Sequence, residues 1–247
     1  MMILDAPLEP AVRVQMREEV REVRGSRRNG NEGPPRSWIE ISPVTSIALS
    51  AKMTEDKELA NFIESQKATY RYDWVRLYCS FFPEQGETFE KAWLNVDLSA
   101  NGAAQPDALP IAWSVTPETQ YDSVQRTISA TLGSELKFTP AKVTAGLSGQ
   151  QTAALKRYFI RSYSVGGAKP FWEMAHTDLA SINGSFAFHL VIRSSRATET
   201  KGVVKLSAVI GARTFLVFRS ERAHADEPVQ EFLLRPAATS SGGRRRG

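Results

Sequence analysis

The chain has 247 residues, of which 42% are hydrophobic and 23% charged, and its formal net charge is +4. This composition is that of an ordinary globular protein, and no apolar run approaches the roughly 20 residues of a membrane-spanning helix. Without the arginine triplet 244–246, 28 basic residues stand against 27 acidic ones, which argues against a nucleic-acid-binding domain with a concentrated basic face. The basic tail is expected to be the only part of the chain that could bind nucleic acid.

Changes in composition divide the chain into four parts. Residues 1–24 are expected to form an amphipathic N-terminal arm, and residues 25–36, rich in Gly, Asn and Pro, a flexible linker. The folded domain is expected to cover residues 37–235. Residues 236–247 end in the arginine triplet and are expected to be a disordered basic tail.

The arm is predicted to be helical. Its apolar residues recur mostly at intervals of four, which gives a narrow stripe with charged residues on the other faces: Leu8, Val12, Met16, Val20 and Val23. A strand that starts at Val12 and Val14 is the alternative interpretation.

The domain reads mainly as strands. The exception is a short helix over Thr54–Ser65, with Thr54 as its N-cap. Alternating apolar and polar residues predict strands at Ala68–Phe82, Glu90–Leu98, Ile111–Val115, Asp122–Leu132, Arg157–Ser164 and Pro170–His176. Beyond Gly133-Ser134, Leu136 and Phe138 continue the apolar pattern of Asp122–Leu132, which suggests a hairpin with a loop of three or five residues there.

The clearest alternation runs from Gly184 to Ser220 and is interpreted as a three-stranded meander. Its first two strands carry apolar residues at every second position: Phe186, Phe188, Leu190 and Ile192, then Val204, Leu206, Ala208 and Ile210. Gly211-Ala212 has the sequence of a two-residue turn, which would place Ala208 opposite Phe215 and Leu206 opposite Val217. Short strands at this density predict an all-β fold, an antiparallel sandwich or jelly roll.

No catalytic, phosphate-binding or metal-binding motif occurs, so we expect no enzyme activity and no cofactor. His189 is expected to be half-exposed on its strand, and His224 to lie in a solvated loop. His176, near Glu173 and Asp178, lacks the spacing of a metal site.

Cys79 is the only cysteine, which excludes an internal disulfide. A chain without disulfides suits a reducing compartment, so a cytoplasmic location is expected. Cys79 alternates with apolar residues and is predicted to be a buried, unreactive thiol.

One strand face combines the residue types that concentrate at binding hot spots. If the apolar residues Val75, Leu77, Cys79 and Phe81 face the core, the opposite face presents Tyr70, Tyr72, Trp74, Arg76 and Tyr78. This aromatic row is the candidate binding site for a ligand or partner. The alternative is that the N-terminal helix or another layer covers the row, which would make it structural.

The sequence therefore favours a non-catalytic β-sandwich that binds a protein partner, itself included, or a small ligand. A coat-like assembly subunit is the second hypothesis, because the chain has a charged arm and a basic tail. A pore-forming β protein is the third, because Ser123–Phe138 is amphipathic and rich in Ser and Thr, although Arg126 falls on its apolar side. An unrecognised hydrolase is the last.

Overall fold

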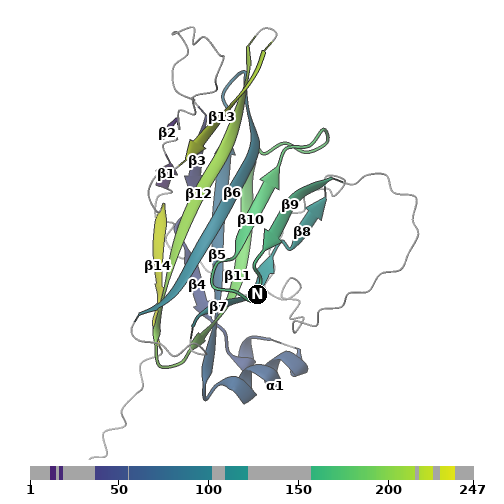
Figure 1. The fold of residues 1–247 in the computed structure, drawn as a ribbon. Helices are drawn as coiled ribbons and strands as arrows, with labels where there is room; N and C mark the ends of the chain where they lie inside the picture. Colours follow the sequence, from purple (N-terminus) through teal and green to yellow (C-terminus); the bar gives the residue numbers. More distant parts are fainter. Residues whose placement is uncertain are drawn as a thin grey trace, which may run out of the picture.

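The computed structural model describes residues 12–14, 17–18, 37–54, 56–101, 109–121, 157–214, 217–224 and 229–236. These residues form two antiparallel sheets that pack face to face, with one α-helix at one end of the sandwich (Figure 1). The all-β sandwich prediction is confirmed.

The first sheet is built around two long strands that pair along their whole length. Phe81 of β5 lies opposite Gly184 of β11, and the ladder runs on to Tyr70 opposite Ser195. The strand order is β1 (Val12–Val14), β3 (Trp38–Ile41), β5 (Tyr70–Phe82), β11 (Gly184–Ser195) and β7 (Ile111–Thr116), while β4 (Thr45–Ala48) pairs with β5 beside β3.

The second sheet is centred on the pair β6 and β12, which runs from Glu87 opposite Ala212 to Asn101 opposite Glu199. Its order is β2 (Arg17–Glu18), β13 (Val217–His224), β12 (Glu199–Thr214), β6 (Glu87–Asn101), β10 (Phe171–Ala175), β9 (Tyr158–Tyr163) and β8 (Thr119–Tyr121). The strand β14 (Gln230–Leu234) pairs with the first half of β12.

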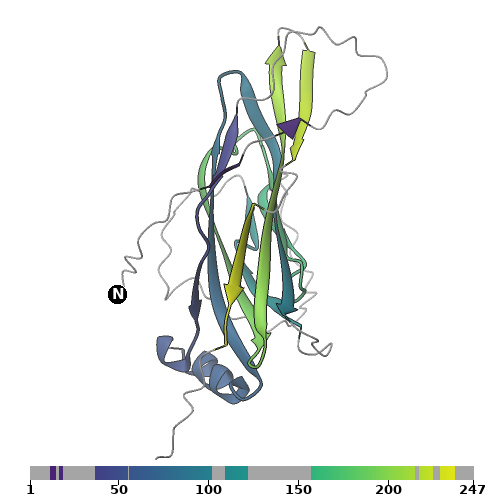
Figure 2. The same ribbon diagram turned by 90° about the vertical axis from the view of Figure 1, so that its left-hand side faces the viewer.

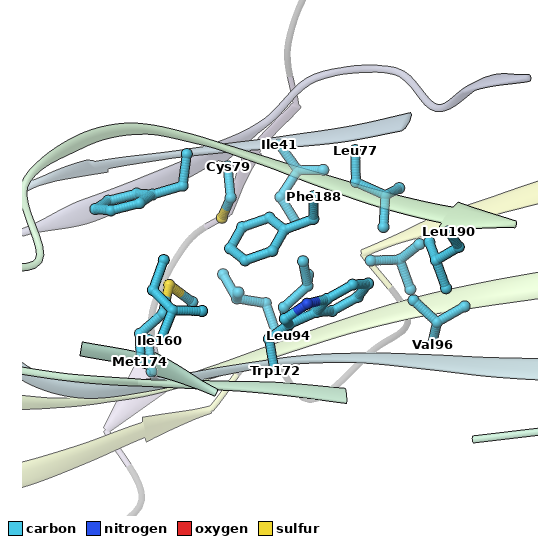
Figure 3. Close-up of a cluster of buried hydrophobic side chains, with 14 of the residues drawn as sticks. Ile41, Leu77, Cys79, Leu94, Val96, Ile160, Trp172, Met174, Phe188 and Leu190 are labelled. Carbon is cyan, nitrogen blue, oxygen red and sulfur yellow. The ribbon is translucent and has the colours of Figure 1, made fainter. Parts of the chain in front are cut away.

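The core lies between the sheets and consists of the side chains that alternate inward from both (Figure 3). Phe188 of β11 and Trp172 of β10 are fully buried and meet across the interface with ring centroids 5.1 Å apart. Burying a side chain of this kind stabilises the fold by roughly 1.5–3 kcal/mol. The period-2 pattern of the sequence thus fixes which face of each strand is inside.

The helix α1 (Lys57–Gln66) follows a 3-10 turn, η1 (Ala51–Met53). Its N-cap is Asp56, whose carboxylate accepts hydrogen bonds from Glu58 N at 2.8 Å and Leu59 N at 3.2 Å. The predicted helix is confirmed, but its N-cap is Asp56 and not Thr54, because the helix begins at Lys57. Within the described residues, no helix has the length and apolar character needed to cross a membrane.

The predicted meander is wrong in its pairing. Consecutive strands β11 and β12 belong to different sheets, so the connection between them crosses the sandwich. Gly211-Ala212 lies inside β12 and makes no turn, since the strand continues to Thr214, which pairs with Val217. β11 and β12 each bury every second side chain, because the two strands belong to opposite sheets and face the same core.

The N-terminal arm differs from the helical prediction where it is described. Val12–Val14 and Arg17–Glu18 are strands that pair with β3 and β13, which is the alternative interpretation. The predictions for residues 25–36, 122–156 and 237–247 lie outside the described residues.

Candidate functional site

The aromatic row lies on the outward face of β5, as the alternation predicts. Val75, Leu77, Cys79 and Phe81 point into the core, and the opposite positions carry the row of Tyr70, Tyr72, Trp74, Arg76 and Tyr78. The antiparallel register with β11 sets Arg193 beside Tyr72, Val191 beside Trp74 and His189 beside Arg76. The row is therefore one column of a wider face of the first sheet.

Part of the row is covered. Tyr72 is 2% exposed and Trp74 7% exposed. They form a second hydrophobic cluster with Val191, against which Phe62 of α1, Trp113 of β7, and Ile47 and Leu49 of the β4 segment pack. Among the described residues, the β4–α1 segment and Trp113 thus cover this part of the row.

The rest of the row stays accessible. Arg76 and Tyr78 are half-buried, and the Arg76 guanidinium carbon lies 5.1 Å from the centroid of Tyr78 and 5.7 Å from that of Trp74. Arg193, at the α1 end of the same face, lies over Tyr70 at 4.6 Å and over Trp113 at 5.2 Å. Neither arginine forms an ion pair with a carboxylate in the described part of the chain.

His189 departs from its predicted half-exposed state. It is 8% exposed, and its ring stacks on Trp74 with centroids 5.2 Å apart and planes 18° apart. Burial, and then the charge of Arg76, lower its pKa to about 4. His189 is consequently neutral at pH 7, and its buried Nδ1 has no hydrogen-bond partner among the described residues.

This face offers fixed positive charge beside aromatic rings. A guanidinium stays protonated at any physiological pH, whereas a histidine with a pKa near 4 cannot supply a proton at neutral pH. The arrangement can hold an anionic group next to an apolar or planar one.

The other residues considered for chemistry are engaged elsewhere. Glu173 accepts a hydrogen bond from the Tyr163 hydroxyl at 3.3 Å. His224 lies on β13 opposite Ser207, so its predicted position in a loop is wrong. Burial raises the pKa of the Cys79 thiol, as expected for an unreactive cysteine. No cluster of three or more metal-ligating side chains occurs in the described ranges.

A second region of interest is formed by β8 and β9, the strands on either side of segment 122–156. β8 and β9 pair antiparallel at the edge of the second sheet, with Thr119 opposite Arg161 and Gln120 opposite Ile160. A bulge then shifts the register by one, so that Tyr121 lies opposite Tyr158. Segment 122–156 therefore leaves and re-enters the sandwich at two adjacent, paired positions. Sequence reasoning missed this pairing, because β8 has only three residues.

The same edge is anchored to the body of the sandwich. Trp172 Nε1 donates a hydrogen bond to the Pro117 carbonyl at 3.0 Å, just before β8. Tyr163 of β9 stacks on Phe171 of β10 with ring centroids 4.7 Å apart and planes 9° apart. These contacts fix the start of β8 and the end of β9, which are the strand ends away from segment 122–156.

Comparisons with known proteins identify no family. No family model matches the chain, and no curated protein matches it. Among solved structures, the chain is similar to Clostridium perfringens delta-toxin, with a TM-score of 0.29, 10% sequence identity, and coverage of 80% of this chain and 82% of that one. At this degree of overlap the likeness does not bear on function.

Proposed function

We propose that this chain is a pore-forming β protein, and that segment 122–156 enters a membrane as a hairpin continuing β8 and β9. The observation that carries the proposal is the register Tyr121 opposite Tyr158. Paired residue numbers there sum to 279, which is odd. Continued along the segment, this register places even-numbered residues of the first half on the same face as odd-numbered residues of the second half.

The sequence of the segment matches that parity. The shared face would carry Ile128, Ala130, Leu132, Ser134, Leu136 and Phe138 with Ala141, Val143, Ala145, Leu147 and Gly149. The opposite face would carry Ser129, Thr131, Gly133, Glu135 and Lys137 with Lys142, Thr144, Gly146, Ser148 and Gln150. If the paired residue numbers had an even sum, apolar and polar residues would be mixed on both faces of the hairpin.

The length of the apolar face also fits. Positions 128–138 and 141–151 contain no charged residue on that face, and each covers about the 9–11 residues that a membrane-crossing strand requires. Arg126 falls on the apolar face but outside this stretch, near the base of the hairpin. An arginine near the membrane interface costs only about 0–1 kcal/mol, so Arg126 is compatible with insertion.

The register also relocates the turn. A sum of 279 puts Thr139 and Pro140 at the tip, in place of the predicted turn at Gly133-Ser134. Proline lacks the backbone N–H that a paired strand position needs, and it therefore suits a strand end. Residues 141–151 would then form the returning strand.

The proposal is tested by release of a fluorescent dye from lipid vesicles and from erythrocyte ghosts. The wild-type chain should release dye. Leu132→Asp, on the apolar face, should abolish release, because a carboxylate there would lie in hydrocarbon. Thr131→Asp is the matched control on the opposite face and should retain release. Equal effects of the two substitutions, or no release by the wild type from either membrane, would contradict the proposal.

The half-buried end of the aromatic row supports a second candidate function, the binding of a partner with an anionic group. Arg76 and Tyr78 are half-buried on a sheet face, and Arg76 has no carboxylate partner among the described residues. Arginine and aromatic side chains are enriched at binding hot spots. Capture of a partner that depends on Arg76 but not on Leu132 would favour this function over pore formation.

A further inference from the structure

We infer that the outer face of the second sheet binds an uncharged saccharide, through a site formed by Phe171, Trp93, Asn95, Asp97 and Lys205. We call these five residues the outer site. The inference goes beyond the proposed function and does not depend on it, because none of the five belongs to segment 122–156 or to the aromatic row.

This face of the second sheet carries no packed layer among the described residues. The two hydrophobic clusters lie between the sheets and on the outer face of the first sheet. The helix α1 packs on the first sheet, at one end of the sandwich (Figure 2). On the second sheet, by contrast, Phe171 of β10 and Trp93 of β6 alternate with core residues and are half-buried on the outside.

Strand pairing brings the outer site together. Phe171 lies opposite Asn95 of β6, and Asn95 lies opposite Lys205 of β12. Trp93 and Asp97 are the next outward positions on β6, on either side of Asn95, because residues two apart in a strand share a face. The three strands lie side by side in front of the first sheet in Figure 1, so the outer site is about 10 Å wide.

The aromatic part of the site is held in a fixed orientation. The ring of Phe171 stacks on Tyr163 of β9, with centroids 4.7 Å apart and planes 9° apart. The Tyr163 hydroxyl donates a hydrogen bond to Glu173 at 3.3 Å, which restrains the stack. Because Tyr163 occupies the β9 side of Phe171, the second face of the Phe171 ring is on the β6 side, where Asn95 lies opposite it.

The charges of this face are largely balanced. Lys205 Nζ donates a hydrogen bond to Asp97 Oδ2 at 2.6 Å, and Lys91 Nζ lies 3.7 Å from Glu173 Oε1. Both carboxylates therefore have a cation beside them, and both lysines an anion. A site for a polyanion such as nucleic acid would instead present several basic side chains to the phosphates. The pairing favours an uncharged ligand.

A saccharide matches both the rings and the polar groups of the outer site. The C–H groups on one side of a sugar ring pack against an aromatic face, here that of Phe171 or Trp93. Sugar hydroxyls donate and accept hydrogen bonds, as the Asn95 amide does. Asp97 adds an acceptor and Lys205 a donor. A purely apolar ligand would take water from these polar groups without replacing its hydrogen bonds, which costs free energy.

The experiment begins with the full chain on a microarray that carries neutral oligosaccharides of glucose, mannose, galactose and N-acetylhexosamines beside sialylated and sulfated ones. The wild type should bind at least one neutral oligosaccharide. Isothermal titration calorimetry with the strongest neutral binder should show affinity losses of about tenfold or more for Trp93→Ala and Phe171→Ala. Asn95→Ala should lose about threefold to tenfold, the equivalent of one hydrogen bond or two.

Two matched controls separate the site from its surroundings. Ser99→Ala removes a polar group from the same face of β6, two residues beyond Asp97, and Trp38→Ala removes a half-buried aromatic ring from the outer face of the first sheet. Both should bind the oligosaccharide as the wild type does. Asn95→Ala replaces a half-buried polar side chain and should keep the wild-type melting temperature, so the test stands even if Trp93→Ala or Phe171→Ala destabilises the fold.

Three results would overturn the inference. The first is an array on which the wild type binds no neutral oligosaccharide, and binding only to sialylated or sulfated ones counts as this result. The second is wild-type affinity in Asn95→Ala or in folded Trp93→Ala. The third is an equal loss of affinity in Ser99→Ala or Trp38→Ala, because the ligand would then not be held by the outer site.

Discussion

Replacing Trp74 tests whether the aromatic row is a structural layer. The side chain is 7% exposed, stacks on His189 at 5.2 Å and belongs to the cluster that α1 covers. Truncating a buried tryptophan to alanine typically costs about 3–5 kcal/mol. Since 1 kcal/mol corresponds to about 2–4 °C in a domain of this size, Trp74→Ala should lower the melting temperature by about 6 °C or more.

Arg76→Ala is the matched variant two residues along the same face. Arg76 is half-buried and forms no described ion pair, so its removal costs mainly two ring contacts of about 0.5–1 kcal/mol each. Its melting temperature should fall by less than half as much. Thermal melts and urea titrations of both variants measure the difference, and an unchanged urea slope would show that the unfolding transition is still the same.

The opposite ranking would refute this reasoning. If Trp74→Ala had the same melting temperature as the wild type, the β4–α1 layer would not cover the row in solution, and the whole row would be open for binding. A loss of partner capture by Arg76→Ala at an unchanged melting temperature would then assign binding to this face.

Further predictions concern the core and the pH dependence of stability. Gly202→Ala should destabilise by about 1–3 kcal/mol in urea titrations, because the added Cβ would lie 2.0 Å from Cζ of Phe232. Phe188→Ala and Leu206→Ala, which truncate core residues of opposite sheets, should each cost about 2–5 kcal/mol. The folded state depresses the pKa of His189 to about 4, so the unfolded chain binds the extra proton below about pH 6.5 and stability falls between about pH 6.5 and pH 4. Urea titrations across this pH range should show that the free energy of unfolding falls less with decreasing pH for His189→Gln than for the wild type. The same pH dependence in both proteins would contradict the burial of His189. Far-UV circular dichroism should be dominated by β signal, and a mainly helical spectrum would contradict the fold.

The sequence by itself determined which side of each long strand is buried. In β6 and β11 apolar residues occupy every second position, and the structure buries those positions. The short helix was also readable from its acidic start and apolar spacing, although its cap moved from Thr54 to Asp56. Such features depend on residues near one another in the chain, so the local pattern suffices to predict them.

Only the tertiary structure decided which strands pair and what covers them. Alternation gives a strand two faces but does not name its neighbours, and for this reason β11 and β12 were wrongly joined in one sheet. His189 is buried because residues distant in sequence, Trp74 among them, pack on the same face.

The hairpin proposed for segment 122–156 illustrates the same division. The segment's own sequence shows two amphipathic halves but does not say which of their faces coincide. That choice depends on whether the strands at its base pair with an odd or an even sum. The one-residue bulge between Gln120 and Tyr121, which only the paired strands reveal, makes the sum odd.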